Sequence, residues 1–324
     1  MNMRSLYNRN GFTPSIISYV SIIFRNATGA ISMHHYHRFM AWLIVLSGCC
    51  LVPGSLAQEL QASRPIAALD SVFLEELTWM EVRDAMQAGK TTVIVGSGGI
   101  EPNGPYVALG KHNYVLQATT EAIARQLGNA LVAPIIKFVP EGSIAPPTGH
   151  MQYPGTLSLR EETFEALLAD VCSSLKQHGF TDIVLIGDHG ANQRGMQAVA
   201  GRLNKQWGGP RRVHYIPEYY AQDMWSYDYL KTLGVHQRPD VRSEARADIH
   251  DDYHYEAIMA TVDPQTIRTE QRLAAGLYSI NGFDMSPPSQ TVANGKKLVE
   301  YRAHLTVAAI RKALASKHST QPQR

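Results

Sequence analysis

Two stretches of the sequence decide the fold: residues 91–95 (TTVIV), which leave through 96–99 (GSGG), and residues 182–186 (DIVLI), which leave through 187–190 (GDHG). Each is a short run of mostly apolar, β-branched or aliphatic residues that ends in a glycine turn. Such runs are typical of strands that are buried on both faces of a parallel sheet. The sequence therefore predicts two central strands, each followed by a loop that carries polar residues.

Helical patterns surround these strands. Residues 78–81 (TWME) form a capping-box pattern that predicts a helix ending at Gly89, and residues 158–161 (SLRE) predict a second capped helix that stops at Gly179. Further strands are predicted at 130–136 and 212–216, and further helices at 113–127, 192–207 and 292–315. Alternation of strands and helices predicts an α/β fold with a mostly parallel sheet covered on both faces.

Composition excludes several classes of protein. The chain has 324 residues, of which 44% are hydrophobic and 18% charged, as in a globular protein with a core and unlike a disordered or collagen-like chain. The net charge is +2, and residues 58–324 alone carry 26 basic and 28 acidic side chains, or −2. We therefore expect no nucleic-acid partner and no attraction to an anionic membrane surface.

The first 57 residues contain four Arg and no acidic residue. Within them, 40–57 (MAWLIVLSGCCLVPGSLA) is an apolar run that ends in a small-x-small cleavage pattern. The run is too short and too broken by Gly and Pro to span a bilayer. We predict a signal or leader segment at 1–57, a linker or arm at 58–75 and one domain at 76–318.

This leader predicts a periplasmic or secreted protein. Cys49 lies in a stretch that resembles a lipoprotein cleavage box, so a lipid anchor at Cys49 is the alternative to simple cleavage near Ala57. The signal peptide or that anchor would be the only contact with a membrane. A buried helix is a further alternative, but the lack of acidic residues argues against it.

Polar residues gather where the predicted strands end, which is where sites form in parallel α/β sheets. One group follows 91–95, a second follows 182–186, a third is the dense run 248–256 (DIHDDYHYE), and His150 lies in the turn-rich stretch 149–156. Carboxylates and imidazoles brought together by separate loops suit a divalent metal such as Zn²⁺ or Mn²⁺. No single spacing is diagnostic, and the alternative is a set of helix caps, turn residues and surface charges.

Three of these segments carry a resemblance. Residues 95–110 (VGSGGIEPNGPYVALG), 150–159 (HMQYPGTLSL) and 186–192 (IGDHGAN) resemble, in the same order, three motifs of the creatininase (creatinine amidohydrolase) family. The resemblance implies a three-layer α/β/α sandwich with a mostly parallel central sheet. It also implies a metal-dependent hydrolase of cyclic or linear amides that forms a homo-oligomer.

The resemblance assigns metal ligands residue by residue. Glu101 matches the first metal carboxylate of the family and His189 its metal histidine, but Asn103 replaces the second metal histidine and His112 replaces the bridging aspartate. Imidazole is a poor bridge between two metals, so we interpret the site as one ion held by Glu101, His112 and His189. Glu256 is the candidate fourth ligand.

The remaining polar residues are assigned to proton transfer and substrate binding. The candidates for proton transfer are His250, Asp252 and His254. The candidates for contact with substrate are Asn103, His150, Asn192 and Tyr253.

These assignments lead to one hypothesis and two rivals. The leading hypothesis is an exported metal-dependent hydrolase that uses activated water on a C–N bond of a small polar, cyclic substrate. The altered ligands make creatinine itself a poor candidate. The rivals are a non-catalytic binding protein built on a decayed hydrolase fold, and a metal-dependent isomerase or lyase of keto-sugars.

Overall fold

The structure is a computed structural model that describes residues 59–221, 223–238 and 251–316. It divides into two compact units, residues 1–63 and 64–324. Only residues 59–63 of the first unit are described, so the predicted leader and the Cys49 box lie outside the described residues. Everything below concerns the second unit.

A four-stranded parallel sheet forms the centre of this unit. Its strand order is β2 (Ala130–Val132), β1 (Thr92–Ser97), β3 (Asp182–Gly187) and β4 (Val213–Tyr215). All six residues of β1 and of β3 are buried, because these two strands lie in the middle of the sheet. The prediction of a parallel sheet with 91–95 and 182–186 at its centre is confirmed.

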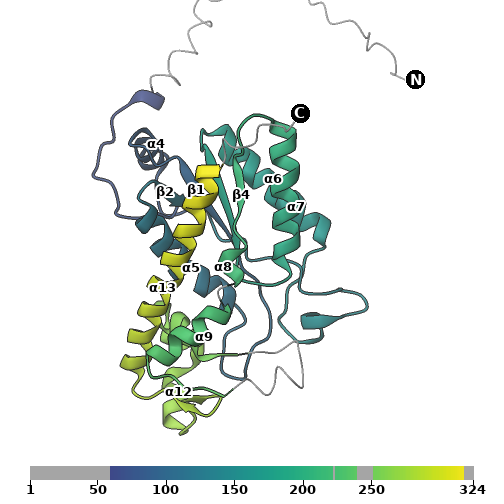
Figure 1. Cartoon of the computed structure of the whole chain (residues 1–324), viewed down its shortest axis with the longest axis vertical. Helices are drawn as coiled ribbons and strands as arrows, with labels where there is room; N and C mark the ends of the chain where they lie inside the picture. The colour runs from purple at the N-terminus through teal and green to yellow at the C-terminus, as the bar shows by residue number, and fades with distance from the viewer. Residues whose placement is uncertain (1–58, 222, 239–250, 317–324) are drawn as a thin grey trace, which may run out of the picture. The chain divides into compact units, whose positions relative to one another are not determined.

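Helices cover both faces of the sheet. On one face pack α6 (Glu161–Gln177) and α7 (Asn192–Trp207), and on the other pack α5 (Lys111–Leu127) and α13 (Pro288–Ala315), as Figure 1 shows. The arrangement is the three-layer α/β/α sandwich that the sequence predicted.

Successive residues of a strand point to opposite faces, and both faces of this sheet are apolar. Val93 and Val95 belong to the core beneath α6 and α7, whereas Ile94 belongs to the core beneath α5 and α13. The buried Cys172 of α6 lies in the first core, and burial raises the pKa of its thiol to about 12. Cys172 is therefore a core residue.

A third apolar core lies beyond the sheet, where α11 (Tyr253–Val262) packs against α5 and α13. The other described elements are α4 (Trp79–Gln87), η1 (Gly149–Gln152), α8 (Glu218–Ala221), α9 (Asp223–Thr232), η2 (Pro264–Ile267), α12 (Thr269–Ala274) and the hairpin of β5 (Ser279–Ile280) and β6 (Phe283–Asp284). Among the described residues, no helix has the length and apolar character needed to cross a bilayer.

The two predicted helix caps differ in outcome. The capping box at the start of α4 is confirmed, because Thr78 Oγ1 accepts from the backbone of Glu81 and the Glu81 carboxylate accepts from Thr78 N. The predicted cap at 158–161 is wrong, since α6 begins at Glu161 without a side-chain cap. The Ser158 hydroxyl instead accepts from Glu141 N at 2.9 Å and donates to Gly142 O at 2.8 Å.

Strand register places three loops at one edge of the sheet. Ser97 at the end of β1 is level with Gly187 at the end of β3, and it also pairs with Ile136 beyond β2. A further bridge joins Val139 to Ser158. The segments that carry Glu101, Glu141, His150 and His189 therefore start from the same edge.

Helices α11 and α13 cross so closely that Gly295 has no room for a side chain. A Cβ on Gly295 would lie 2.0 Å from the carbonyl oxygen of Ala257. We predict that Gly295→Ala lowers the free energy of unfolding by about 1–3 kcal/mol, the usual cost of overpacking a core. Urea denaturation measures this change.

Gly201, in α7, is the matched control, because a Cβ there would meet no atom within 4 Å. Gly201→Ala should leave stability unchanged or raise it by up to about 1 kcal/mol through helix propensity. Equal effects of the two substitutions would contradict the close crossing.

Candidate metal centre

Four side chains from three segments of the chain meet at the carboxyl edge of the sheet. Glu101, Glu141, His150 and His189 each offer one ligand atom, and these four atoms lie within 4.8 Å of one another. Glu101 and Glu141 are buried, while the histidine side chains keep 12% and 10% of their surface exposed. The group therefore reaches solvent only through its two imidazoles.

The loop after β1 holds Glu101. Glu101 N donates to Leu109 O at 3.0 Å, and the Asn103 amide donates to Glu101 O at 3.1 Å. Asn192, at the start of α7, donates to both Ser97 O and Gly98 O at 2.8 Å. These bonds fix the backbone on both sides of the turn and direct the Glu101 carboxylate into the interior.

Two neighbours allow Glu141 to reach the same point: Ser158 holds its backbone, and Gly99 leaves space for its side chain. Ser158 binds the backbone of Glu141, as described above. Gly99 has no Cβ, and a Cβ there would lie 2.4 Å from Glu141 Oε1. The glycine turn after β1 thus admits the second carboxylate.

The two imidazoles face both carboxylates. His150 Nδ1 lies 2.9 Å from Glu101 Oε2 and 2.9 Å from Glu141 Oε2. His189 Nε2 lies 2.9 Å from Glu101 Oε2 and 3.4 Å from Glu141 Oε2. His189 stands in the tight turn that follows β3, and His150 in η1.

A second layer of charge lies behind this group. His112 Nε2 is 2.8 Å from Glu101 Oε1, and His112 Nδ1 is 2.7 Å from Asp188 Oδ2. Asp188 in turn accepts from Arg302 of α13 at 3.1 Å. Burial and Lys111 act to lower the pKa of His112, but the carboxylates of Glu101 and Asp188 raise it to about 9.

Lys111 is fully buried beside the group. Its Nζ lies 3.3 Å from Glu101 Oε1 and 4.5 Å from the centre of the Tyr255 ring. Burial would raise the pKa of Glu101, but His112, Lys111 and His150 together hold it well below its usual value. Burial and the neighbouring Glu256 raise the pKa of Asp251, whereas Lys111 acts to lower it.

The donor atoms fit a divalent ion. Glu101 Oε2 and Glu141 Oε1 are buried without a hydrogen-bond partner of good geometry. Buried polar atoms are rarely left unsatisfied, and two on neighbouring carboxylates indicate a bound ion or water. Two carboxylates and two imidazoles are a ligand set that both Zn²⁺ and Mn²⁺ accept.

Glu101 and His189, two of the four residues predicted as ligands, lie in this group. His112 lies directly behind it, hydrogen-bonded to Glu101, and not among the four clustered donors. Glu256 lies elsewhere, in a buried ion pair with Arg272. The other two members of the group are Glu141 and His150, and His150 was predicted to contact substrate.

The residues predicted for proton transfer lie at or before the start of α11. His250 is outside the described residues. Asp252 accepts from Tyr227 and from Gln237, and the His254 ring packs 3.9 Å from the ring of Tyr255. Their roles stay predictions.

The residues predicted to contact substrate lie in three different settings. Asn103 and Asn192 bind backbone carbonyls of the turn after β1, as described above. Tyr253 belongs to the third apolar core, where its hydroxyl accepts from Asn294 at 3.0 Å. His150 alone is clustered with the carboxylates, and contact with substrate stays a prediction for all four.

Sequence reasoning missed Glu141. The residue stands in a Pro-Glu-Gly turn that matches none of the quoted motifs. A signal was available, because Glu141 follows the predicted strand 130–136 just as Glu101 follows 91–95, and parallel strands end at one edge.

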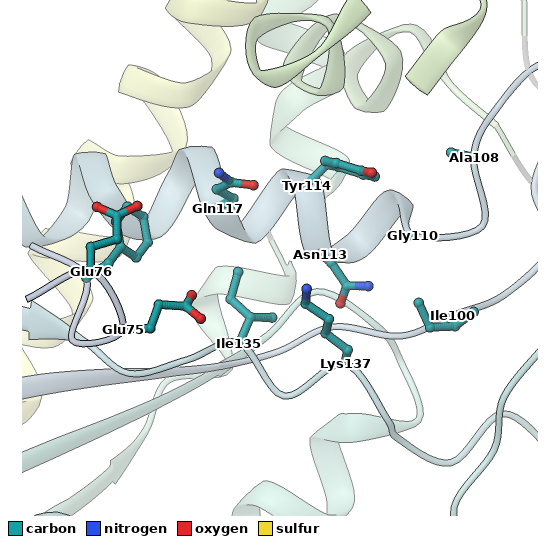
Figure 2. Close-up of a pocket in the computed structure, with 11 residues that line it drawn as sticks. Glu75, Glu76, Ile100, Ala108, Gly110, Asn113, Tyr114, Gln117, Ile135 and Lys137 are labelled. Carbon is teal, nitrogen blue, oxygen red and sulfur yellow. The ribbon is translucent and has the colours of Figure 1, made fainter. Parts of the chain in front are cut away.

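A pocket of about 460 Å³ lies beside the loop that carries Glu101. Its wall includes Ile100 and Ala108 of that loop, and Figure 2 shows Tyr114 and Gln117 on α5 across from Lys137. None of the four clustered residues lines it. We therefore locate the chemistry at the cluster and not in this pocket.

Fold and site together define an α/β protein with a buried carboxylate–histidine centre at the sheet edge. The profile of the creatininase family, described as creatinine amidohydrolase, matches residues 75–309. The chain belongs to the creatininase family, whose members are metal-dependent amidohydrolases acting on C–N bonds.

Individual relatives agree with this membership. Creatinine amidohydrolase of Pseudomonas putida is 29% identical over 122 residues, which are 38% of this chain and 46% of that protein. The match thus spans about half the length of the relative. A crystal structure of creatininase is 21% identical to this chain, with a TM-score of 0.52, and the match covers 79% of this chain and 100% of that chain. A structure named as manganese creatininase is 20% identical, with a TM-score of 0.51, and that match covers 78% of this chain and 100% of the other.

We predict that Glu141→Gln weakens binding of Mn²⁺ or Zn²⁺ by more than about a hundredfold. Loss of an outer-layer partner typically costs 10–100-fold in metal affinity, and loss of a charged ligand costs more. Isothermal titration calorimetry on the full chain measures this. Glu162→Gln is the control, because that side chain is 69% exposed, and equal affinities of the two variants would contradict the role of Glu141.

Proposed function

We propose that this protein hydrolyses a C–N bond of a small amide, cyclic or linear, with one divalent ion held by Glu101, Glu141, His150 and His189. One observation carries the proposal: four ionisable side chains from the segments after β1, β2 and β3 converge within 4.8 Å at the sheet edge. Family membership supports the reaction class.

A divalent ion in this position supplies Lewis-acid polarisation of a carbonyl and activates water for attack. The chain's own residues supply the framework for that chemistry. Glu101 and Glu141 bring negative charge into a buried site, where their pull on a cation is stronger than in water. Asp188 orients His112, and His112 orients Glu101, which is the support that metal ligands commonly receive.

Proton transfer is assigned to groups near the cluster. His254 contacts Tyr255, whose ring centre lies 6.2 Å from that of His112. His254 and Asp252 remain the candidates on α11 for delivering a proton to the leaving nitrogen.

The substrate is proposed from the family and the exposed part of the site. A mutant creatininase crystallised with creatine, 20% identical to this chain with a TM-score of 0.51, shows that a small guanidino compound binds that protein. Here Asn103 and His112 replace residues of the family motif. We therefore propose a small polar amide other than creatinine, such as a hydantoin or lactam.

We predict metal-dependent hydrolysis by the purified chain. Hydantoins, lactams and creatinine are incubated with the Mn²⁺- or Zn²⁺-loaded protein in H₂¹⁸O, and ring opening is followed by mass spectrometry. One ¹⁸O atom per product is expected, with loss of activity on chelation and recovery on adding metal.

Binding without turnover across this panel would favour the binding-protein hypothesis. Keto-sugars are included in the same assay, and their turnover without incorporation of ¹⁸O would favour an isomerase or lyase. Glu162→Gln serves as the active control in each assay.

We propose further that the protein is exported, because residues 1–57 have the charge pattern and apolar run of a signal peptide. Expressed in full length in a Gram-negative host, it should be recovered from the periplasm with Gln58 as its first residue. Leu46→Arg should retain it in the cytoplasm. Cys49→Ser separates cleavage from lipidation, since loss of membrane association in that variant alone would indicate an anchor.

A further inference from the structure

The two oxygens of Glu101 have different surroundings. Oε2 faces the cluster, with nitrogens of His150 and His189 each 2.9 Å away. Oε1 points the other way, with His112 Nε2 at 2.8 Å and Lys111 Nζ at 3.3 Å. The Glu101 carboxylate therefore has one oxygen, Oε2, that faces the cluster and one, Oε1, that faces His112 and Lys111.

Occupation of Oε1 restricts what Glu101 can bind. A carboxylate oxygen has two lone pairs, and a nitrogen lies within reach of each on Oε1. A carboxylate joins two metal ions by giving one oxygen to each. Beside Oε2 the nitrogens belong to His150 and His189, and an imidazole can turn a lone pair to the same ion. Beside Oε1 the Lys111 ammonium has no lone pair and cannot become a ligand.

Charge gives the same answer. Lys111 and Arg302 already bring two positive charges to Glu101 and Asp188, and all four side chains are buried. A second divalent ion would add two more positive charges beside them. Net positive charge in a buried site is costly.

We propose that Lys111 is a built-in cation that occupies the Oε1 side of Glu101 and limits the centre to one divalent ion per chain. The ammonium is fully buried, held between Glu101 and the Tyr255 ring. Lys111 thus acts as a positioning residue and sets the metal content. This inference rests on the proposed function, because it presumes that the cluster binds a metal.

The test uses the full chain and measures metal binding directly. The wild-type protein, freed of metal and saturated with Mn²⁺ or Zn²⁺, should hold one ion per chain by elemental analysis and by calorimetry. Two ions in the wild type would overturn the role of Lys111 and leave the proposed function intact. No binding would overturn both.

Substitution of Lys111 separates charge from shape. Lys111→Met keeps most of the side-chain volume and removes repulsion of the ion, so the metal should bind at least about tenfold more tightly. Lys111→Arg keeps the charge and should stay within about threefold of the wild type. Unchanged or weaker binding in Lys111→Met would show that Lys111 only fills space.

Lys176→Met is the matched control. Lys176 lies on α6 with its ammonium over the Trp207 ring, at 4.9 Å from the ring centre, and away from the cluster. Its metal affinity and metal content should equal those of the wild type. If Lys111→Met fails to fold, two ions per chain in the wild type would still overturn the proposal.

Discussion

The interaction on which the site depends is the burial of the Glu101 carboxylate among three imidazoles and the Lys111 ammonium. A buried carboxylate is unstable unless paired and hydrogen-bonded, and here His112 and Lys111 bind one oxygen while His150 and His189 approach the other. Asn192 fixes the turn after β1, and this turn positions the Glu101 carboxylate. Residue 99 in that turn is glycine, because Glu141 occupies the space that a side chain at position 99 would fill.

The sheet explains why such distant residues meet. Parallel strands end at one edge, so the loops after β1 and β3 deliver one group each to the same place, and the segment beyond β2 delivers two, Glu141 and His150. The third core, formed by α11 with α5 and α13, supports the opposite side of Lys111 through Tyr255. Stability of this helical layer and geometry of the cluster are therefore linked.

Much of this could be predicted from the sequence, because the patterns involved are local. Apolar runs predicted the central strands, and the motif around 95–110 singled out Glu101 as a candidate metal ligand. What could not be predicted depends on contacts across the fold. Ser158 was predicted to cap a helix, but its hydroxyl binds the backbone of Glu141. Two predicted ligands lie outside the cluster of four: His112 is hydrogen-bonded to Glu101, and Glu256 pairs with Arg272 sixteen residues later.

The central claim is that one ion sits between Glu101 Oε2, Glu141, His150 and His189. Anomalous diffraction from crystals grown with Mn²⁺ or Zn²⁺, collected at the absorption edge of the metal, tests it most directly. We expect one anomalous peak per chain, about 2.0–2.2 Å from an oxygen or nitrogen of each of the four residues. A peak coordinated by Glu256 or by His112, or no peak at the sheet edge, would contradict the account.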